Sequence, residues 1–311
     1  MRSNIQRGRV AAIVPTLNGG RVWAKCMEAL ANQSLPDYSM LVIDSGSVDG
    51  TVRIAEKFGA RVLRIPKVEF DHGGTRQLGV ELSADAEIVA FLTHDAVLAD
   101  AGALARLIDG FSDENVGAVF GRQLPRPQAR PIEAHARLYN YPTVSRTTSL
   151  ADVGRLGIKA AFLSNSFSAY RREALLAVGG FPEKLILGED TVVAARLLLA
   201  GWKVGYRADA LVYHSHDYTA SQEFRRYFDT GVLHASERWL IDRLGSPEGE
   251  GKRFVRSEIG YLLETAPRDV LVALWRTAVK LAGYRLGRIE RFLPASMKRH
   301  LSMRKDYWQE A

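Results

Sequence analysis

Acidic residues in this sequence stand just after apolar runs that are typical of β-strands. Residues 38–43 form one such run and residues 88–92 another, and an aspartate follows each within a few positions. Polar side chains at the carboxyl ends of parallel strands are where an open α/β sheet presents its ligand. Further along the chain come two pairs of titratable residues: Glu189 with Asp190, and His214 with His216. The ordered set predicts an enzyme site assembled from distant segments.

Asp95 offers a hard oxygen ligand after a buried strand, which suits Mg²⁺ or Mn²⁺ bound between two phosphate groups. His94 stands directly before it and is expected beside it at the donor site, so this position supplies a single carboxylate. His214 and His216 follow another strand-like run, and imidazole is a common metal ligand. We expect one of the two to bind the metal, with His214 as the first choice. The alternative is that both histidines are structural.

Glu189 and Asp190 precede an apolar helical segment. A transfer to a hydroxyl group needs a carboxylate that accepts the hydroxyl proton during the attack. The pair is the candidate for this general base. The alternative is an acidic cap for the helix that begins at Thr191, where the helix dipole favours negative charge.

The ends of the first two predicted strands are the candidate nucleoside-binding site. Pro15, Thr16 and Asn18 close the first strand and offer free backbone groups and a hydroxyl. Asp44 and Ser45 close the second strand, and the alternative for Asp44 is a turn or helix-capping acid. Asp49 precedes Gly50-Thr51 and fits a capping role.

Arg76 follows Gly73-Gly74 at a predicted helix start. Glycines there would let a diphosphate approach the backbone, and a guanidinium pairs with phosphate oxygens in a forked geometry. We therefore expect Arg76 to bind a diphosphate. The alternative is a surface arginine on an amphipathic helix. His72 could touch the same ligand or stabilise the turn.

Apolar periodicity alternates between strand and helix in the first half of the chain. The predicted strands are 10–14, 38–43, 61–65, 88–92 and 116–120, and the predicted helices are 21–32, 51–58, 75–82 and 104–111. This order implies a mostly parallel sheet with right-handed crossovers. Between 124 and 159 prolines interrupt polar stretches, so we expect a mobile or acceptor-shaping insert outside the sheet. Strands 162–170 and 203–207 and helices 171–178, 190–200 and 223–240 are predicted after it.

The composition is that of a globular protein, with 47% of the 311 residues apolar and 25% charged. Cys26 is the only cysteine, which excludes a disulfide framework within the chain and fits a reducing cytoplasm. We expect Cys26 to be buried in a helix. The basic first residues lack the apolar core of a signal peptide, and no stretch approaches the roughly 20 apolar residues that span a bilayer. We expect neither secretion by that route nor a membrane span.

The excess positive charge lies in the tail. Residues 252–311 hold 13 Lys and Arg against 6 Asp and Glu, which equals the net +7 of the whole chain. Basic side chains recur there among Trp, Tyr and Leu, a pattern typical of a helix in an anionic membrane interface. The alternative is a helical appendage packed on the catalytic part. We expect no nucleic-acid partner, because no recognised nucleic-acid module is present.

We divide the chain into a catalytic domain (1–244), a linker (245–251) and a basic helical region (252–311). The linker is the segment Gly-Ser-Pro-Glu-Gly-Glu-Gly. This division predicts that a chain ending near Gly249 stays soluble and, if folded, still binds the donor.

The order of motifs over about residues 8–242 resembles the family 2 glycosyltransferases, which have the GT-A fold. Within that family the sequence is most similar to bacterial rhamnosyltransferases of cell-surface polysaccharide (O-antigen) assembly. The motifs that carry the closer resemblance are Phe70-Asp71-His72-Gly73-Gly74-Thr75-Arg76, Thr93-His94-Asp95-Ala96 in place of the usual Asp-x-Asp, Tyr213-His214-Ser215-His216 and Gly283-Tyr284-Arg285-Leu286-Gly287. The resemblance implies an α/β, Rossmann-like, mostly parallel sheet with flanking helices, here with a basic helical C-terminal extension.

The resemblance also implies an inverting, metal-dependent transfer of L-rhamnose from dTDP-L-rhamnose to a glycolipid or oligosaccharide acceptor. With a lipid-linked acceptor the enzyme would work in the cytoplasm, peripheral to the inner face of the cell membrane. The family places its base at Asp190 and a late histidine ligand near His214. It also implies that Asp44 accepts from the pyrimidine N3–H and that Asn165 and Ser166 lie on the acceptor side. Another donor such as a UDP-hexose, the linkage and the oligomeric state stay open.

Two other classes of function fit the motifs less well. A nucleotidyltransferase normally carries a Gly-rich, Lys-containing loop near the first strand, where this chain has Pro15-Thr16-Leu17-Asn18. A sugar-nucleotide-binding protein without activity would be expected to lack the carboxylate of Asp95 or of Asp190, and both are present. Fold alone does not decide chemistry, so these residues favour the enzyme.

Overall fold

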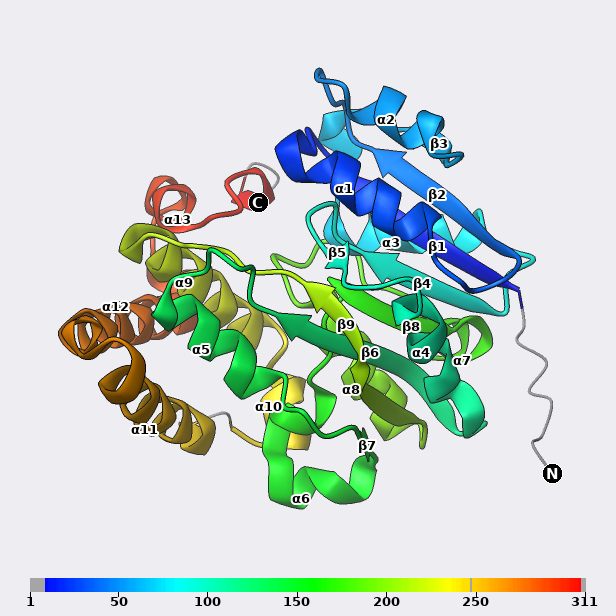
Figure 1. Ribbon diagram of the computed structural model, residues 1–311. Coiled ribbons are helices and arrows are strands. Elements are labelled where there is room, and N and C mark those ends of the chain that lie inside the picture. Colours follow the sequence, from blue (N-terminus) through cyan, green and yellow to red (C-terminus); the bar gives the residue numbers. More distant parts are fainter. Residues whose placement is uncertain (1–8, 247, 309–311) are drawn as a thin grey trace.

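A mixed sheet organises the computed structural model, which describes residues 9–246 and 248–308 (Figure 1). Within those residues the strand order is β3-β2-β1-β4-β8-β6-β9-β5, and β7 pairs with β9. The strands are β1 (Val10–Thr16), β2 (Tyr38–Asp44), β3 (Arg61–Arg64), β4 (Ile88–Leu92), β5 (Val97–Leu98), β6 (Val116–Leu124), β7 (Arg146–Thr148), β8 (Phe167–Arg171) and β9 (Lys203–Tyr213). β5, β7 and β8 oppose the other six strands, which share one direction. The predicted mostly parallel α/β sheet is confirmed.

Both faces of the sheet are covered by helices. Along β1, Val10, Ala12 and Val14 enter one core, whereas Ala11 and Ile13 enter the other, because successive side chains of a strand point to opposite faces. The first core is closed by α1 (Gly20–Ala31), α2 (Thr51–Lys57) and α4 (Ala103–Ile108). The second is closed by α3 (His72–Glu81), α7 (Arg172–Ala177) and α8 (Glu189–Leu199). Burial on both faces explains why these strands are continuous apolar runs in the sequence.

Several element boundaries differ from the prediction for identifiable reasons. β1 continues through Pro15, at a point where pairing with β4 has already ended at Ile13. α3 begins earlier because the side chain of Asp71 caps it, accepting from the N–H of Gly74 at 2.7 Å. The predicted helix 223–240 is interrupted at Glu237, giving α9 (Ala220–Ser236) and α10 (Arg238–Leu244).

The expectation of an insert outside the sheet between 124 and 159 was wrong. This segment contains α5 (Pro131–Asn140), β7, which joins the sheet beside β9, and the short helix α6 (Val153–Leu156). Pro131 is the first residue of α5, where the missing N–H breaks no helical hydrogen bond. Pro131 thus starts an element, whereas Pro125 and Pro142 follow the ends of β6 and α5.

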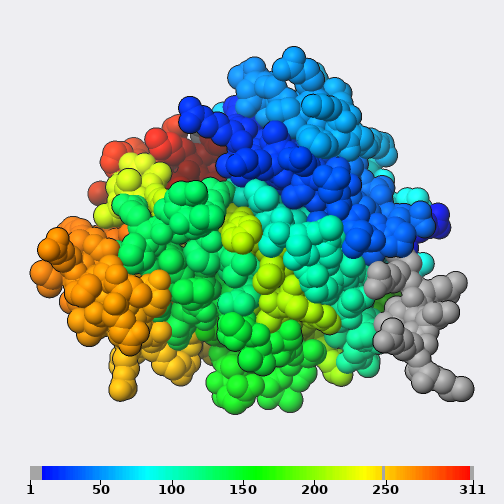
Figure 2. All heavy atoms as spheres, viewed as in Figure 1, coloured from blue at the N-terminus to red at the C-terminus, as the bar shows by residue number. Residues whose placement is uncertain are grey.

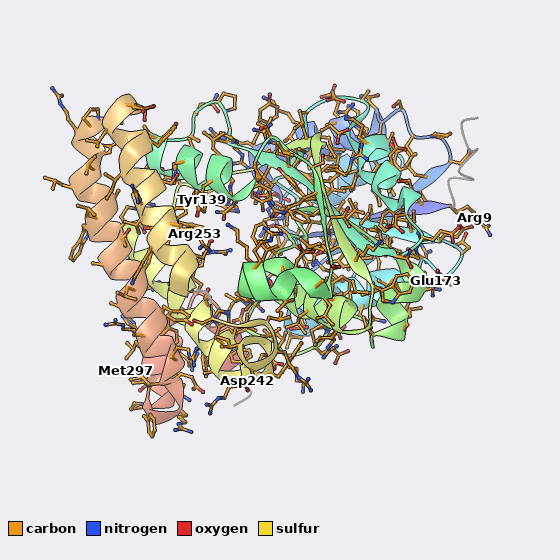
Figure 3. The ribbon with its side chains drawn as sticks, turned by 90° about the horizontal axis from the view of Figure 1, so that it is seen from below. Arg9, Tyr139, Glu173, Asp242, Arg253 and Met297 are labelled. Atoms are coloured by element: carbon orange, nitrogen blue, oxygen red, sulfur yellow. The ribbon has the colours of Figure 1, made fainter. Side chains whose placement is uncertain are left out.

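The tail forms α11 (Glu248–Thr265), α12 (Val270–Arg288) and α13 (Ala295–Leu301). α12 packs along α9 with the two backbones in close contact: a Cβ added at Gly283 or Gly287 would overlap the carbonyl oxygen of Phe224 or Phe228. Seen from below, α11 and α12 lie at one end of the molecule (Figure 3). In the view of Figure 1, the surface at this end continues that of the neighbouring α5 and α9 (Figure 2). The tail is therefore packed on the catalytic part, as the alternative stated.

This packing changes two expectations about the tail. Removal of the chain after Gly249 would expose the face of α9 that α12 covers, so the expected soluble, donor-binding fragment is not supported. Residues 248–251, which we expected in a linker, belong to α11, and Pro247 lies outside the described residues. The division into domains itself stays a prediction. No helix among the described residues combines the length and the apolarity needed to cross a bilayer.

Candidate active site

Strand register brings Asp95 and the histidine pair together. β5 pairs antiparallel with the end of β9, with Val97 opposite Tyr213. Asp95 lies two residues before this pair and His214 one residue after it. As a result, Nε2 of His214 is 3.4 Å from Oδ1 of Asp95, and Nδ1 of His216 is 3.7 Å from Oδ2. One ligand atom from each of the three side chains lies within 4.8 Å of the others.

The neighbours of His214 favour the neutral tautomer that can bind a metal through Nε2. Its Nδ1 is 2.9 Å from Oε1 of Gln123, whose amide nitrogen donates to Ser164 at 2.9 Å. The Gln123 oxygen therefore accepts, and the proton of a neutral His214 sits on Nδ1. Burial lowers the pKa of His214, which keeps the ring neutral. Nε2 is buried and has no hydrogen-bond partner among the described residues, so its lone pair is available to a cation.

Asp95 is ionised and held by a residue that the sequence did not reveal. Burial alone would raise the pKa of Asp95, but the close approach of the His214 ring and the neighbouring His216 keep it well below its usual range. The guanidinium of Arg126 donates to Oδ2 at 3.2 Å and to the backbone carbonyl at 2.9 Å. Arg126 lies in the proline-flanked segment after β6, which extends to Leu124; because the predicted strand ended at residue 120, no local signal indicated Arg126.

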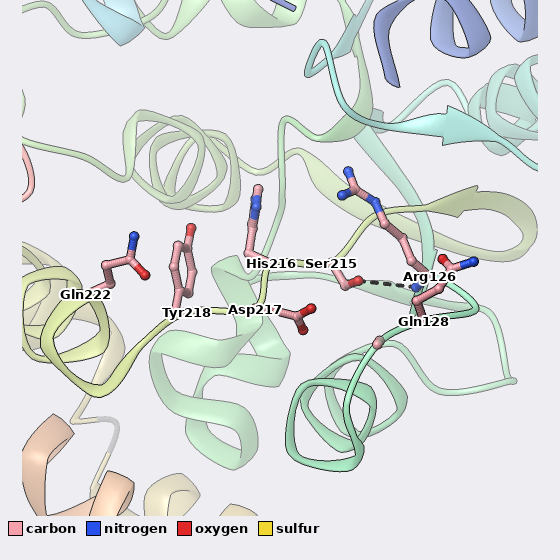
Figure 4. A pocket seen from close by; sticks show the side chains of 8 residues that line it. Arg126, Gln128, Ser215, His216, Asp217, Tyr218 and Gln222 are labelled. Atoms are coloured by element: carbon pink, nitrogen blue, oxygen red, sulfur yellow. Dashed lines mark hydrogen bonds between the residues drawn. The ribbon is translucent and has the colours of Figure 1, made fainter. Parts of the chain in front are cut away.

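A pocket of about 480 Å³ opens beside this cluster (Figure 4). His216 stands at its wall, with its ring stacked on that of Tyr218 at a centroid distance of 5.2 Å. The lining residues are Arg126, Gln128, Ala129, Ser215, His216, Asp217, Tyr218 and Gln222. Most of these are polar, which suits a hydroxyl-rich ligand.

The carboxylate pair lies in the first turn of α8. β8 runs antiparallel beside β4, with Phe167 opposite Leu92, so the residues before β8 reach the end of the sheet that carries Asp95. One of them, Asn165, donates its side-chain amide to Glu189 at 3.2 Å and its backbone N–H to Asp190 at 3.2 Å. Ser168 and Tyr170 both donate to Oδ1 of Asn165, which fixes the amide orientation. Ser166 is partly exposed nearby.

The two carboxylates have different electrostatic surroundings. Arg76 lies 3.0 Å from Oε1 of Glu189, and both side chains are buried. Burial would raise the pKa of Glu189, but Arg76 lowers it. Burial and the charge of Glu189 raise the pKa of Asp190 to about 6. A carboxylate with that pKa is deprotonated at neutral pH and still a useful base. Asp190 also accepts from the N–H of Thr191 at 2.8 Å, but α8 begins at Glu189 with Gly188 as its N-cap, so neither acid caps the helix as the alternative supposed.

Arg76 occupies a different environment from the exposed arginine that the alternative supposed. Its guanidinium also donates to the carbonyl of His72 at 2.8 Å, and its Nε has no partner among the described residues. Gly73 is required because a Cβ there would overlap the carbonyl oxygen of Pro182. Gly73 therefore has a packing role, whereas the approach of a diphosphate to Gly73-Gly74 and the role of Arg76 there stay predictions. Burial lowers the pKa of His72 to about 3.

The strand ends expected to meet a nucleoside form one buried corner. Oδ2 of Asp44 accepts from the N–H groups of Gly46 and Ser47 at 3.2 and 3.0 Å, which is the turn role. Oδ1 of Asp44 and the hydroxyl of Thr16 are buried without a partner in the described part of the chain. Ser45 donates to the carbonyl of Thr16 at 3.0 Å. Two acceptor-capable oxygens thus remain available at this corner.

The other expected residues lie around this corner. Pro15 is part of β1, and Asn18 bridges to the next loop through Ser47 and Val48. Asp49 accepts from the N–H of Thr51 at 2.9 Å in the turn before α2, whose N-cap is Gly50, so Asp49 stabilises the turn and does not cap the helix. His94 is partly exposed in the turn after β4. Cys26 is buried in α1 as expected, and its thiol donates to the carbonyl of Ala96.

Residues 11–179 match the family model described as glycosyl transferase family 2. The chain is 46% identical, over 96% of its own length and 96% of the relative's, to the O-antigen chain rhamnosyltransferase RfbN of Salmonella typhimurium. It is 46% identical, over 95% and 94% of the two lengths, to the O-antigen chain rhamnosyltransferase WbaN of Salmonella anatum. The mannosyltransferase PcManGT from Pyrobaculum calidifontis, solved with GDP-Man and Mn²⁺, shares the fold at a TM-score of 0.65 and 17% identity, over 92% of this chain and 89% of that one.

Proposed function

The chain belongs to glycosyl transferase family 2, and from that premise we propose that it transfers L-rhamnose from dTDP-L-rhamnose to a lipid-linked saccharide with inversion at the anomeric carbon. The observation that carries the proposal is Asp190, a carboxylate with a pKa of about 6 at the same end of the sheet as the Asp95–His214–His216 cluster. The two Salmonella relatives, named as O-antigen rhamnosyltransferases, support rhamnose as the sugar.

Asp190 accepts the proton of the acceptor hydroxyl as the hydroxyl oxygen bonds to the anomeric carbon and the bond to the diphosphate breaks. Asn165 keeps the carboxylate in place through its backbone N–H, and Glu189 keeps its pKa high enough for it to act as a base. The acceptor saccharide would occupy the polar pocket beside His216.

Asp95, His214 and His216 would hold a divalent cation. The free Nε2 of His214 and the ionised Asp95 fit this role. Two imidazoles suit Mn²⁺ better than Mg²⁺, which prefers a shell made of oxygen atoms. Bound there, the cation would neutralise the charge that develops on the leaving diphosphate. Arg126, already paired with Asp95, supplies a further positive charge at the same place.

The free oxygens of Thr16 and Asp44 would receive the nucleoside. Oδ1 of Asp44 can accept from the N3–H of a pyrimidine, which thymine and uracil both carry. Asp44 therefore selects a pyrimidine without separating dTDP from UDP. A UDP-hexose stays the alternative donor.

The outer face of α12 would rest on an anionic membrane surface. Leu271, Trp275 and Leu281 on this face are 78, 64 and 47% exposed. Exposed arginines flank them at both ends: Arg268, Arg285 and Arg288. Apolar side chains bordered by cations fit the boundary between lipid headgroups and acyl chains. This placement would bring a lipid-linked acceptor to the enzyme at the inner face of the cell membrane.

A panel of nucleotide sugars tests the function. The chain is incubated with a lipid-linked saccharide acceptor and each donor in turn, and the released nucleoside diphosphate is measured. We expect release with dTDP-L-rhamnose and a product whose rhamnose has the opposite anomeric configuration to the donor. Release with a UDP-hexose alone would show that the donor is a UDP-hexose and not dTDP-L-rhamnose. A product with retained anomeric configuration would refute the role of Asp190.

A further inference from the structure

The buried guanidinium of Arg276 joins the C-terminal helix α12 to three other segments. Nε donates to Oε2 of Glu223 at 2.6 Å, and Nη1 donates to Oε1 of Glu133 at 2.7 Å. Nη2 donates to the backbone carbonyl of Tyr218 at 3.0 Å. Only 7% of the Arg276 side chain is exposed. A fork of fixed, planar donors can hold three groups at once, which a lysine ammonium on a flexible stem does less well.

Each of these partners belongs to a segment that borders the pocket. Glu133 lies in the first turn of α5, soon after the lining residues Arg126–Ala129. Glu223 lies in the first turn of α9, next to the lining residue Gln222. Tyr218 lines the pocket itself, and its ring stacks on His216. Arg276 therefore links the segment that carries the histidines, through Tyr218, to the first turns of α5 and α9.

We propose that Arg276 is a positioning residue for the segment 214–218. By holding the carbonyl of Tyr218 and the first turns of α5 and α9, it fixes the ring on which His216 stacks. His216 Nδ1 is thereby kept 3.7 Å from Oδ2 of Asp95. The consequence for metal binding rests on the proposed function, whereas the positioning of the segment does not. The tail thus contributes to the active site from a helix outside the motifs of the catalytic part.

Lys280 provides a matched control. It lies one turn further along α12, and its Nζ is 3.2 Å from Oε1 of Glu223, the other oxygen of the carboxylate that Arg276 holds. It also lies near the rings of Tyr227 and Phe254. Within the described residues it makes no contact with the segment 214–218. A change of Lys280 therefore alters the same buried charge cluster without touching Tyr218.

The test compares Arg276→Lys with Lys280→Met in the full chain. Hydrogen–deuterium exchange is followed in peptides covering 124–134 and 212–224, and Mn²⁺ affinity in the presence of dTDP is followed by electron paramagnetic resonance. Arg276→Lys keeps a positive charge beside Glu133 and Glu223, so we expect it to fold. We expect about tenfold faster exchange in these peptides and about tenfold weaker Mn²⁺ binding, at the lower end of the range for lost outer-shell contacts. Lys280→Met should leave both near the values of the unaltered chain.

Unchanged exchange in Arg276→Lys, or an equal increase in Lys280→Met, would overturn the proposal. Failure of the unaltered chain to bind Mn²⁺ would count against the proposed metal site, and the exchange comparison would then decide the positioning role alone. Should Arg276→Lys not fold, the paired change Arg276→Gln and Glu133→Gln removes one cation and one anion together. We expect the same localised increase in exchange from that pair, and its absence would equally overturn the proposal.

Discussion

Glu189 and Asp190 are adjacent in the first turn of α8, yet their surroundings shift their pKa values in opposite directions. Arg76, 3.0 Å from Glu189, keeps that carboxylate ionised against the effect of burial. The resulting negative charge, together with burial, raises the pKa of Asp190 to about 6. Oppositely shifted carboxylates in one site indicate separate roles. This difference supports the proposal that Asp190 accepts the proton while Glu189 raises the pKa of Asp190.

The acidic limb of the pH–rate profile should reflect the protonation of Asp190. The base works only when deprotonated, so kcat/KM for the acceptor should fall below a pH of about 6, by about tenfold for each further unit. Glu189→Gln removes the negative charge that raises this pKa and leaves Arg76 to lower it. The limb should therefore move to lower pH in that variant. A limb that stays in place or moves upward would show that another group limits the rate.

Metal removal should abolish transfer, and Mg²⁺ or Mn²⁺ should restore it. Asp95→Ala should raise the required metal concentration sharply, because it removes the only carboxylate of the cluster, and His214→Ala should raise it more mildly. Gln123→Met keeps the three ligands but removes the oxygen that accepts from His214 Nδ1, so it should weaken metal binding by about 10- to 100-fold. Full activity in a chelator would remove the metal role of Asp95.

The contact between α9 and α12 should make Gly287 intolerant of a side chain. A Cβ at this position would overlap the carbonyl oxygen of Phe228, so Gly287→Ala should lower the free energy of unfolding by about 1–3 kcal/mol. Gly260, in the middle of α11, has open space around it. Gly260→Ala should raise the free energy of unfolding by about 0.5–1 kcal/mol, because alanine favours a helix. Denaturant unfolding measures the free energy of unfolding of both variants. An equal change in Gly287→Ala and Gly260→Ala would contradict the close packing of α12 on α9.

Binding to anionic vesicles should depend on the outer face of α12. Trp275→Ser combined with Leu271→Ser should reduce sedimentation with vesicles at low salt. These exposed side chains supply apolar area that would be buried in the membrane, and the change removes it. High salt should release the unaltered chain, since each basic residue contributes about 1 kcal/mol that is screened over about 8 Å. Leu176→Ser, at an exposed leucine of α7, should leave binding unchanged. Equal binding by all three chains would remove α12 from the membrane contact.

The sequence predicted the parallel strands well because local periodicity and burial coincide there: the predicted strand 88–92 is β4 without change. It also named Asp95 and His214 correctly as neighbours, since both follow strand ends. Arg126 and Gln123 could not be found in the same way. Their roles come from the pairing of β6 with β9, a contact across about 90 residues that leaves no local pattern.

The tail shows the same limit more clearly. Its charge and its apolar residues predicted helices, and three helices formed within the described residues. No local pattern indicated that Gly283 and Gly287 face α9 or that Arg276 reaches Tyr218, because both depend on which face of α12 is buried. A helix with apolar residues on more than one side does not reveal that face by periodicity alone.

The most direct measurement of the central claim is the turnover of Asp190→Asn with donor binding measured in parallel. Asparagine keeps the size and one acceptor oxygen but cannot accept a proton at neutral pH. We expect turnover to fall by about 10²- to 10⁴-fold while the affinity for the nucleotide donor stays within a few-fold. Turnover equal to that of the unaltered chain would contradict the assignment of Asp190 as the base and with it the proposed mechanism.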